Sequence, residues 1–330
     1  MKVLVTGGAG FLGAHLAREL VGRGREVVVL DDLSGGLREN VPEGAELVVG
    51  SICDVELVAR LFREHRFEVV FHLAAYAAEG LSHFIRRYNY TNNVVGSVTL
   101  INEAIRHRTR RFVFTSSIAV YGAGELPLRE THTPHPEDPY GIAKLAVEQD
   151  LASAFSQFGL EHTIFRPHNL YGAHQSMRDR YRNVVGIFLN QAMQGKPLTI
   201  FGDGTQTRAF TYVGDVIGAL AESGWHDGAR NQVFNVGGDR AFTVRELAET
   251  VLRVTGARSD LRHLPARNEV AHAWSDHTRL REVFGAGEET ELEDGLRRTW
   301  AWARSVGPSE TPPFAAIELD DGLPAIWRDA

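Results

Sequence analysis

The sequence contains a single cysteine, Cys53, among 330 residues, so a disulfide within the chain is excluded. A chain with almost no cysteine is typical of a reducing compartment. No apolar run approaches the ~18 residues that a membrane-spanning helix requires. The N-terminus leads directly into a strand-like segment and shows no signal-peptide pattern. We therefore expect a cytoplasmic protein that does not associate with a membrane.

The sequence also lacks a surplus of basic residues. Lysine and arginine together number 35 against 42 aspartate and glutamate residues, which gives a formal net charge of -7. Nucleic-acid-binding proteins usually carry a basic patch, so we expect no nucleic-acid partner. We also predict no metal site, and we interpret Cys53, between Ile52 and Asp54, as a small buried residue and not as a ligand. Basic residues that matter for function should act singly, at a small anionic ligand.

Short apolar segments alternate with amphipathic helical patterns through the first half of the chain. The strand-like segments cover residues 2–6, 27–30, 46–49, 69–73, 111–115 and 162–165. Strands that alternate with helices predict a parallel sheet with helices on both faces. The pattern loosens after about Gly172, which indicates a smaller second unit of mixed composition.

A glycine-rich loop follows the first predicted strand and precedes a helix. It contains Gly7, Gly8, Gly10 and Gly13. Such glycines permit a tight turn and close backbone approach to a pyrophosphate, while the helix N-terminus offers N–H donors to the phosphates. The predicted cofactor contacts at this loop are Gly7, Gly10, Phe11, Leu12 and Gly13.

Asp31 and Asp32 end the second predicted strand, about 20 residues after the loop. A carboxylate at this place binds ribose hydroxyls and repels a 2′-phosphate, so NAD is favoured over NADP. The alternation and the loop together predict an α/β fold, with a Rossmann-type doubly wound parallel sheet and a smaller mixed α/β substrate domain. The predicted NAD-binding domain covers residues 1–171, with a return segment at about 209–240. The substrate domain covers 172–208 and 241–305, and 306–330 form a C-terminal extension.

Tyr140 and Lys144 lie four residues apart in a predicted helix, so both side chains share one face. An ammonium group near a phenol lowers the phenol's pKa, and a tyrosine activated in this way can accept a proton from a substrate hydroxyl. Ser117 follows the strand-like segment 111–115 and is expected to hydrogen-bond the same substrate oxygen. These three residues are the predicted catalytic group.

The ordered motifs resemble the extended short-chain dehydrogenase/reductase family, specifically its NAD-dependent nucleotide-sugar epimerases and dehydratases. They are TGGAGFLG at 6–13, HLAA at 72–75, two serines before VYG within 116–122, and YGIAK at 140–144. The resemblance extends to about Trp302. It implies further cofactor contacts from Asp54, Leu73, Ala74, Ala75, Asn93, Tyr140 and Lys144.

The resemblance also implies a nucleotide-diphosphate sugar substrate. Asn169 matches a sugar-nucleotide contact, and Arg208 and Arg267 match diphosphate-binding arginines, whose planar guanidinium suits two phosphate oxygens. Glu79 and His168 lie in segments that look closer to the 3,5-epimerase branch. We expect both, together with Ser117, to contact substrate. The candidate proton-transfer groups in these segments are Glu79, Ser82, His83 and His168.

The residues after Ser117 discriminate between reactions. The family's 4,6-dehydratases carry an Asp-Glu pair there, whereas this chain has Ile118 and Ala119, which transfer no proton. The remaining set is closest to that of UDP-glucose 4-epimerases, which implies epimerisation at C4 through a transient 4-keto sugar. The alternatives are a 3,5-epimerase or 4,6-dehydratase-like enzyme with an unassigned acid or base, an ordinary dehydrogenase, and a non-catalytic NAD-binding sensor. The nucleotide base and the sugar stay open.

A homodimer is the assembly expected from the family, through the helices predicted at 92–107 and 140–158. Val147, Leu151 and Phe155 form an apolar stripe at four-residue spacing on the second helix. This stripe has two interpretations, because it either covers a partner subunit or packs inward on the sheet.

Overall fold

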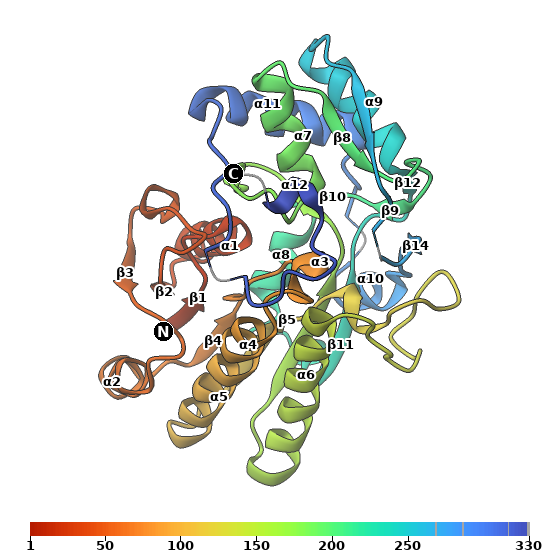
Figure 1. Cartoon of the computed structure of the whole chain (residues 1–330). Helices are drawn as coiled ribbons and strands as arrows, with labels where there is room; N and C mark the ends of the chain where they lie inside the picture. The colour runs from red at the N-terminus through yellow and green to blue at the C-terminus, as the bar shows by residue number, and fades with distance from the viewer. Residues whose placement is uncertain (268, 286, 316, 329–330) are drawn as a thin grey trace.

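A seven-stranded parallel sheet forms the centre of the protein (Figure 1). The computed structural model describes residues 1–267, 269–285, 287–315 and 317–328. The strand order is β11-β6-β5-β4-β1-β2-β3, and every neighbouring pair is parallel. The strands are β1 (Lys2–Thr6), β2 (Glu26–Asp31), β3 (Ala45–Val49), β4 (Val69–His72), β5 (Arg111–Thr115), β6 (His162–Pro167) and β11 (Gln232–Val236). The predicted Rossmann-type fold is confirmed.

Helices cover both faces of this sheet, because the central strands are apolar on both sides. In β1, Leu4 packs into one core while Val3 and Val5 pack into the other. The first core receives α2 (Val55–His65), α5 (Gly96–Arg106) and α6 (Pro139–Phe158). The second receives α1 (Phe11–Gly22), α8 (Gly214–Glu222) and α10 (Thr278–Phe284). Strand β11 and helix α8 thus belong to the sheet domain, although they come from the second half of the chain.

A smaller group of elements lies above the sheet in Figure 1 and has a separate core. Its helices are α7 (Val184–Met193), α9 (Val244–Thr255) and α11 (Leu292–Val306). Its strands are β7 (Leu170–Tyr171), β8 (Leu198–Phe201), β9 (Thr207–Ala209), β10 (Thr211–Tyr212), β12 (Ala241–Thr243), β13 (Leu261–Leu264) and β14 (His272–Ala273). The exact division of the chain into domains stays a prediction.

Short elements complete the chain. They are α3 (Glu79–Ser82), α4 (Arg86–Tyr90), the π-helical turn η2 (Thr91–Val95), α12 (Ala325–Arg328) and three 3-10 turns, η1 (Arg38–Asn40), η3 (Ile118–Val120) and η4 (Asp227–Ala229). The helix predicted at 92–107 is therefore α5 preceded by a π-helical turn. Helices α3 and α4 lie in the long connection that leaves β4.

The apolar stripe on α6 packs mostly inward. Val147 and Leu151 are fully buried in the core beneath the sheet, whereas Phe155 is 41% exposed. Two of the three stripe residues are therefore explained by packing against the chain's own sheet, and their spacing gives no support for an interface. The homodimer stays a prediction.

The position of α6 depends on a buried ion pair. Arg166 of β6 donates from Nε to Glu148 Oε1 at 3.0 Å, and both side chains are 6% exposed. Ser116, immediately after β5, donates to the same carboxylate. Arg166 also donates to the hydroxyl of Tyr121 at 2.7 Å, and Tyr121 donates to Asn235 of β11 at 2.8 Å. This network joins α6 to three strands of the sheet.

Glu148→Ala should destabilise the protein strongly, because it leaves the buried guanidinium of Arg166 without its carboxylate. Breaking a buried pair in this way costs about 3–5 kcal/mol. Urea unfolding monitored by circular dichroism measures this loss. The double variant Glu148→Leu/Arg166→Met is the control, since removing both charges should restore much of the stability. Equal destabilisation in the single and double variants would contradict the assignment.

Candidate active site

A cavity of about 470 Å³ opens at the carboxyl edge of the sheet. Parallel strands bring their carboxyl ends to one edge, so the loops after β1, β2, β4, β5 and β6 all reach it. Most residues that the sequence nominated line this cavity. They are Gly7, Gly10, Phe11, Leu12, Gly13, Asp31, Asp32, Leu73, Ala74, Ala75, Glu79, Ser117, Tyr140, Lys144, His168, Asn169, Arg208 and Arg267.

The glycine loop has the backbone that a dinucleotide cradle needs. Gly7 has a φ of 71°, and a Cβ at Gly13 would lie 2.1 Å from the Gly7 carbonyl oxygen. Gly10 caps α1 with no side-chain hydrogen bond, so the first turn of the helix presents backbone N–H groups to the cavity wall. These features fit the pyrophosphate of NAD.

Asp31 and Asp32 end β2 beside this loop. The Asp31 carboxylate accepts from the backbone N–H of Ala9 at 3.0 Å and of Leu33 at 2.8 Å. Burial raises the pKa of Asp31, and these two hydrogen bonds oppose the rise. Asp32 accepts from the N–H and the hydroxyl of Ser34. Each carboxylate keeps acceptor capacity for ribose hydroxyls.

Two nominated residues do not line the cavity. Asp54 caps α2 by accepting from Leu57 N at 3.0 Å. The Asn93 side chain accepts a hydrogen bond from the backbone N–H of Tyr76 and donates one to the Tyr76 carbonyl. Asn93 is buried, with 2% of its surface exposed. In this structure Asn93 therefore holds the loop after β4. Near Asp54 in the chain, Gly50 and Ile52 line the cavity.

Ser117, Tyr140 and Lys144 lie on the same wall of the cavity. Ser117 follows β5, and its oxygen accepts from Ala119 N at 3.1 Å. Asp138 caps α6 and accepts from Gly141 N at 2.9 Å, which starts the helix just before Tyr140. Lys144 donates from Nζ to the Thr115 carbonyl at 2.7 Å.

The prediction that Lys144 lowers the pKa of Tyr140 is wrong for this structure. Burial raises the pKa of Tyr140, and the Glu79 carboxylate raises it further, while a hydrogen bond with Ser117 opposes the rise. The Lys144 ammonium lies 5.8 Å from the Tyr140 ring centroid, over the ring face. Burial also lowers the pKa of Lys144 to about 7, against the attraction of Glu148.

Glu79 begins helix α3 on the cavity wall. Its side chain is reached from the cavity, yet protein surrounds it on the other sides, and this desolvation raises its pKa to about 7. The charge of Asp138 contributes to the rise, and those of Arg208 and Arg267 oppose it. Ser82 accepts from Tyr140 N at 3.2 Å and thereby anchors α3 beside the start of α6.

The two nominated arginines meet at a carboxylate that sequence reasoning missed. Glu269 Oε2 lies 2.9 Å from Arg267 Nη2 and 3.6 Å from Arg208 Nη2. Arg208 also donates to the carbonyls of Thr207 and Ala271, at 2.8 and 3.0 Å. The Nε of Arg267 is buried and has no hydrogen-bond partner within the described parts of the chain. The proximity of Glu269 to Arg267 in the sequence was the available signal.

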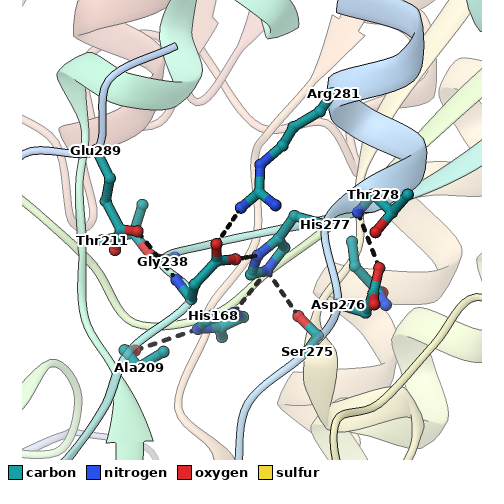
Figure 2. A network of polar contacts seen from close by, with 12 residues as sticks. His168, Ala209, Thr211, Gly238, Ser275, Asp276, His277, Thr278, Arg281 and Glu289 are labelled. Carbon is teal, nitrogen blue, oxygen red and sulfur yellow. Dashed lines mark hydrogen bonds and ion pairs between the residues drawn. The ribbon is translucent and has the colours of Figure 1, made fainter. Parts of the chain in front are cut away.

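His168 turns into the protein, although it is part of the cavity wall. Figure 2 shows its ring between the Ala209 carbonyl and His277. Nδ1 lies 3.2 Å from the carbonyl oxygen, and Nε2 lies 3.2 Å from His277 Nε2. His277 in turn contacts Asp239 at 2.9 Å and Ser275 at 3.0 Å. Both ring nitrogens of His168 are therefore engaged, and burial lowers its pKa to about 3.

A parallel sheet, a glycine cradle at its carboxyl edge and a Ser-Tyr-Lys group on one cavity define a Rossmann-type, dinucleotide-dependent enzyme. A sequence model of the NAD dependent epimerase/dehydratase family matches residues 3–237, and the chain belongs to this family. The predicted family and its cofactor, NAD, are confirmed.

Known proteins similar to this chain cover nearly its whole length. A UDP-glucose 4-epimerase of Azospirillum brasilense is 35% identical over 325 residues, which is 93% of each chain. A UDP-N-acetyl-alpha-D-glucosaminuronate decarboxylase of Bacillus cytotoxicus is 30% identical over 321 residues, 92% of this chain and 98% of the relative. The crystal structure of UDP-glucose 4-epimerase from Thermotoga maritima with UDP-glucose has a TM-score of 0.87 and 35% identity, and covers 93% of this chain and 99% of its own. Relatives of this similarity thus differ in reaction.

Within the part of the chain that the structure describes, no helix has both the length and the apolar character to span a bilayer.

The stability of the protein should fall as the pH drops from about 6.5 toward 3. Burial holds the pKa of His72 and of His168 at about 3, so the unfolded chain takes up protons that the folded chain does not. Each such proton contributes about 1.4 kcal/mol per pH unit. Urea unfolding across this range should show a shallower slope for His168→Gln. The same replacement at the exposed His135 is the control, and equal slopes in the two variants would contradict the assignment.

Proposed function

We propose that this protein is an NAD-dependent nucleotide-sugar 4-epimerase of the UDP-glucose/UDP-galactose type. One observation carries the proposal: Ser117, Tyr140 and Lys144 share a cavity with the glycine cradle, while Ile118 and Ala119 occupy the places of a dehydratase's acid and base. The similarity to UDP-glucose 4-epimerases supports this choice.

The residues that would hold NAD are the glycine cradle, Asp31 and Lys144. Bound there, NAD supplies a reversible acceptor for the hydride on the sugar C4. Lys144 is already fixed by its hydrogen bond to Thr115 and keeps two further donors for a ribose hydroxyl. Its pKa of about 7 means that the ammonium is only partly charged at neutral pH until it gains such a partner.

Tyr140 is the proposed proton acceptor and donor at the sugar 4-hydroxyl. Ser117 stabilises the phenolate by donating a hydrogen bond, which favours proton removal. Glu79 acts in the opposite direction while it is ionised, because its negative charge disfavours the phenolate. Protonation of Glu79 or its neutralisation by a ligand would therefore ease deprotonation of Tyr140. Return of the hydride to the opposite face of C4, together with return of the proton from Tyr140 to the sugar oxygen, would complete the epimerisation without a further acid or base.

Arg267 is the better placed of the two proposed diphosphate contacts. Among the residues that the structure describes, its Nε has no hydrogen-bond partner, and its terminal nitrogens donate only to Glu269. Arg208 is more committed, because backbone carbonyls already accept from both of its terminal nitrogens. We propose that Arg208 contributes mainly charge and that Arg267 donates directly. Asn169, in the left-handed region with a φ of 39°, is the proposed sugar contact from the loop after β6.

Tyr140→Phe should lower kcat for the interconversion of UDP-glucose and UDP-galactose by roughly 10²–10⁴-fold, because it removes the proton acceptor. Nucleotide-sugar chromatography measures the turnover, and the absorbance of cofactor released on denaturation measures bound NAD. Tyr90→Phe is the matched control, since Tyr90 is absent from the cavity wall. A wild-type protein that interconverts another sugar nucleotide but not this pair would disprove the proposed substrate.

Glu79 supports a second candidate, a 3,5-epimerase. A transient 4-keto group acidifies the protons at C3 and C5, and a cavity carboxylate with a pKa of about 7 is suited to remove one of them. That proton would exchange with solvent, whereas C4 epimerisation transfers its hydride internally.

Turnover of UDP-glucose in D2O should therefore give products without deuterium at any carbon, as detected by mass spectrometry. This result supports the 4-epimerase. Deuterium at C3 or C5 that disappears in Glu79→Gln would instead favour the second candidate. His83→Gln, on the same loop but outside the cavity wall, is the control for changes of charge state in this segment.

A further inference from the structure

The described residues of the C-terminal segment, 309–315 and 317–328, contact both the smaller unit and the connection that leaves β4. Ser309 N donates to Asn190 of α7 at 2.9 Å, and Phe314 N donates to the Tyr181 hydroxyl at 2.8 Å. Glu318 accepts from the N–H groups of Arg87 and Tyr88, each at 2.8 Å. Because Glu318 caps the start of α4, the segment is fastened both to the smaller unit and to the sheet domain. Figure 1 shows α12 between α7 and α3.

Trp327 of α12 ends this path inside the protein, with 3% of its surface exposed. It belongs to an apolar cluster that includes Ala78, Leu81 and Tyr181. Its ring centroid lies 5.4 Å from that of Tyr181 and 6.1 Å from that of Phe201. Through Trp327, the described part of the C-terminal segment is therefore packed against residues from earlier in the chain.

The contacts of Trp327 coincide with the cavity wall. A Cβ at Gly80 would lie 3.1 Å from the Trp327 ring, and the Arg267 guanidinium lies 6.0 Å from its centroid. Gly80, Tyr181, Phe201 and Arg267 all line the cavity, whereas Trp327 itself stands behind them. One side chain from the end of the chain thus lies behind four wall residues from four separate segments.

The Arg267 guanidinium lies against aromatic rings of this cluster. It is 4.6 Å from the Phe201 ring centroid and 6.0 Å from that of Trp327, and it donates a hydrogen bond to Glu269. An aromatic face attracts a guanidinium and orients its plane, while the N–H groups at its edge stay available for a ligand. The buried, unpartnered Nε fits a guanidinium held by ring faces more than by hydrogen bonds.

We propose that the C-terminal segment is part of the nucleotide-sugar site and that Trp327 is a positioning residue that sets the orientation of Arg267. This inference rests on the proposed function, since it takes Arg267 as a diphosphate contact. Trp327 touches neither cofactor nor substrate, and the segment acts from behind the wall. Loss of the ring should therefore weaken binding of the nucleotide sugar and leave NAD binding unchanged.

The test compares three replacements of Trp327 with UDP-glucose as the probe. Trp327→Leu fills the apolar space without a ring, Trp327→Phe keeps a ring, and Trp327→Ala removes both. We expect the dissociation constant of UDP-glucose, by isothermal titration calorimetry, to rise roughly tenfold in the leucine variant and to recover in the phenylalanine variant. The NAD content and kcat should stay within about twofold of wild type, so that KM alone changes.

A double-mutant cycle with Arg267→Ala separates positioning from general stability. If Trp327 acts through Arg267, adding Trp327→Leu to Arg267→Ala should have little further effect on binding. Leu319→Ala, on a half-exposed residue of the same segment, is the control and should bind like wild type. The leucine variant decides the matter if the alanine variant fails to fold, and thermal unfolding of each variant checks its folding.

The inference is wrong if Trp327→Leu binds UDP-glucose like wild type. It is also wrong if the two replacements raise the dissociation constant independently, so that their effects multiply. Either result leaves the proposed function standing. Binding of UDP-glucose by wild type without conversion to UDP-galactose would overturn the proposed function, and the cycle would still judge the role of Trp327. If wild type binds neither UDP-glucose nor UDP, both proposals are wrong.

Discussion

The carboxylate of Glu148 joins the helix that carries Tyr140 and Lys144 to the sheet beneath it. These three residues are spaced four apart on one face of α6, so a constraint on Glu148 fixes the other two. Arg166 binds this carboxylate from β6, and Ser116 binds it from the end of β5. Since Ser117 is the next residue, one buried group sets the spacing between Ser117 and Tyr140. Small displacements of α6 would separate the proposed catalytic atoms, whatever else occupied the cavity.

Charge is distributed unevenly along the cavity. Asp31 and Asp32 lie beside the glycine cradle, where ribose hydroxyls are the expected partners, and Arg208 and Arg267 lie toward the smaller unit. This arrangement explains how a protein with a net charge of -7 can hold an anionic substrate. Glu269 balances both arginines in the structure. A diphosphate that reached Arg267 would therefore compete with this carboxylate.

Patterns confined to a few neighbouring residues were predicted well. The alternation of strands and helices gave the Rossmann-type fold, and the glycine spacing placed a cradle where the structure has one. Other interpretations depend on a residue's surroundings, which the sequence does not show. Asp54 caps a helix, most of the α6 stripe packs on the sheet, and His168 is enclosed by His277 and Ala209. A helix cap, a core residue and a ligand contact use the same residue types, and only burial and partners distinguish them.

The sequence by itself determined the fold, the family and the cofactor class, because each depends on local spacing: the period of apolar residues, glycines at a turn, and a tyrosine and lysine one helical turn apart. Tertiary structure alone decided the ionisation of the site. The pKa of Tyr140 is raised because burial and Glu79 outweigh Ser117, and Glu79 comes from a different loop. The tertiary structure also places Trp327 behind Arg267, which lies sixty residues earlier in the chain. No local pattern signals this contact, because it forms only when distant segments pack together.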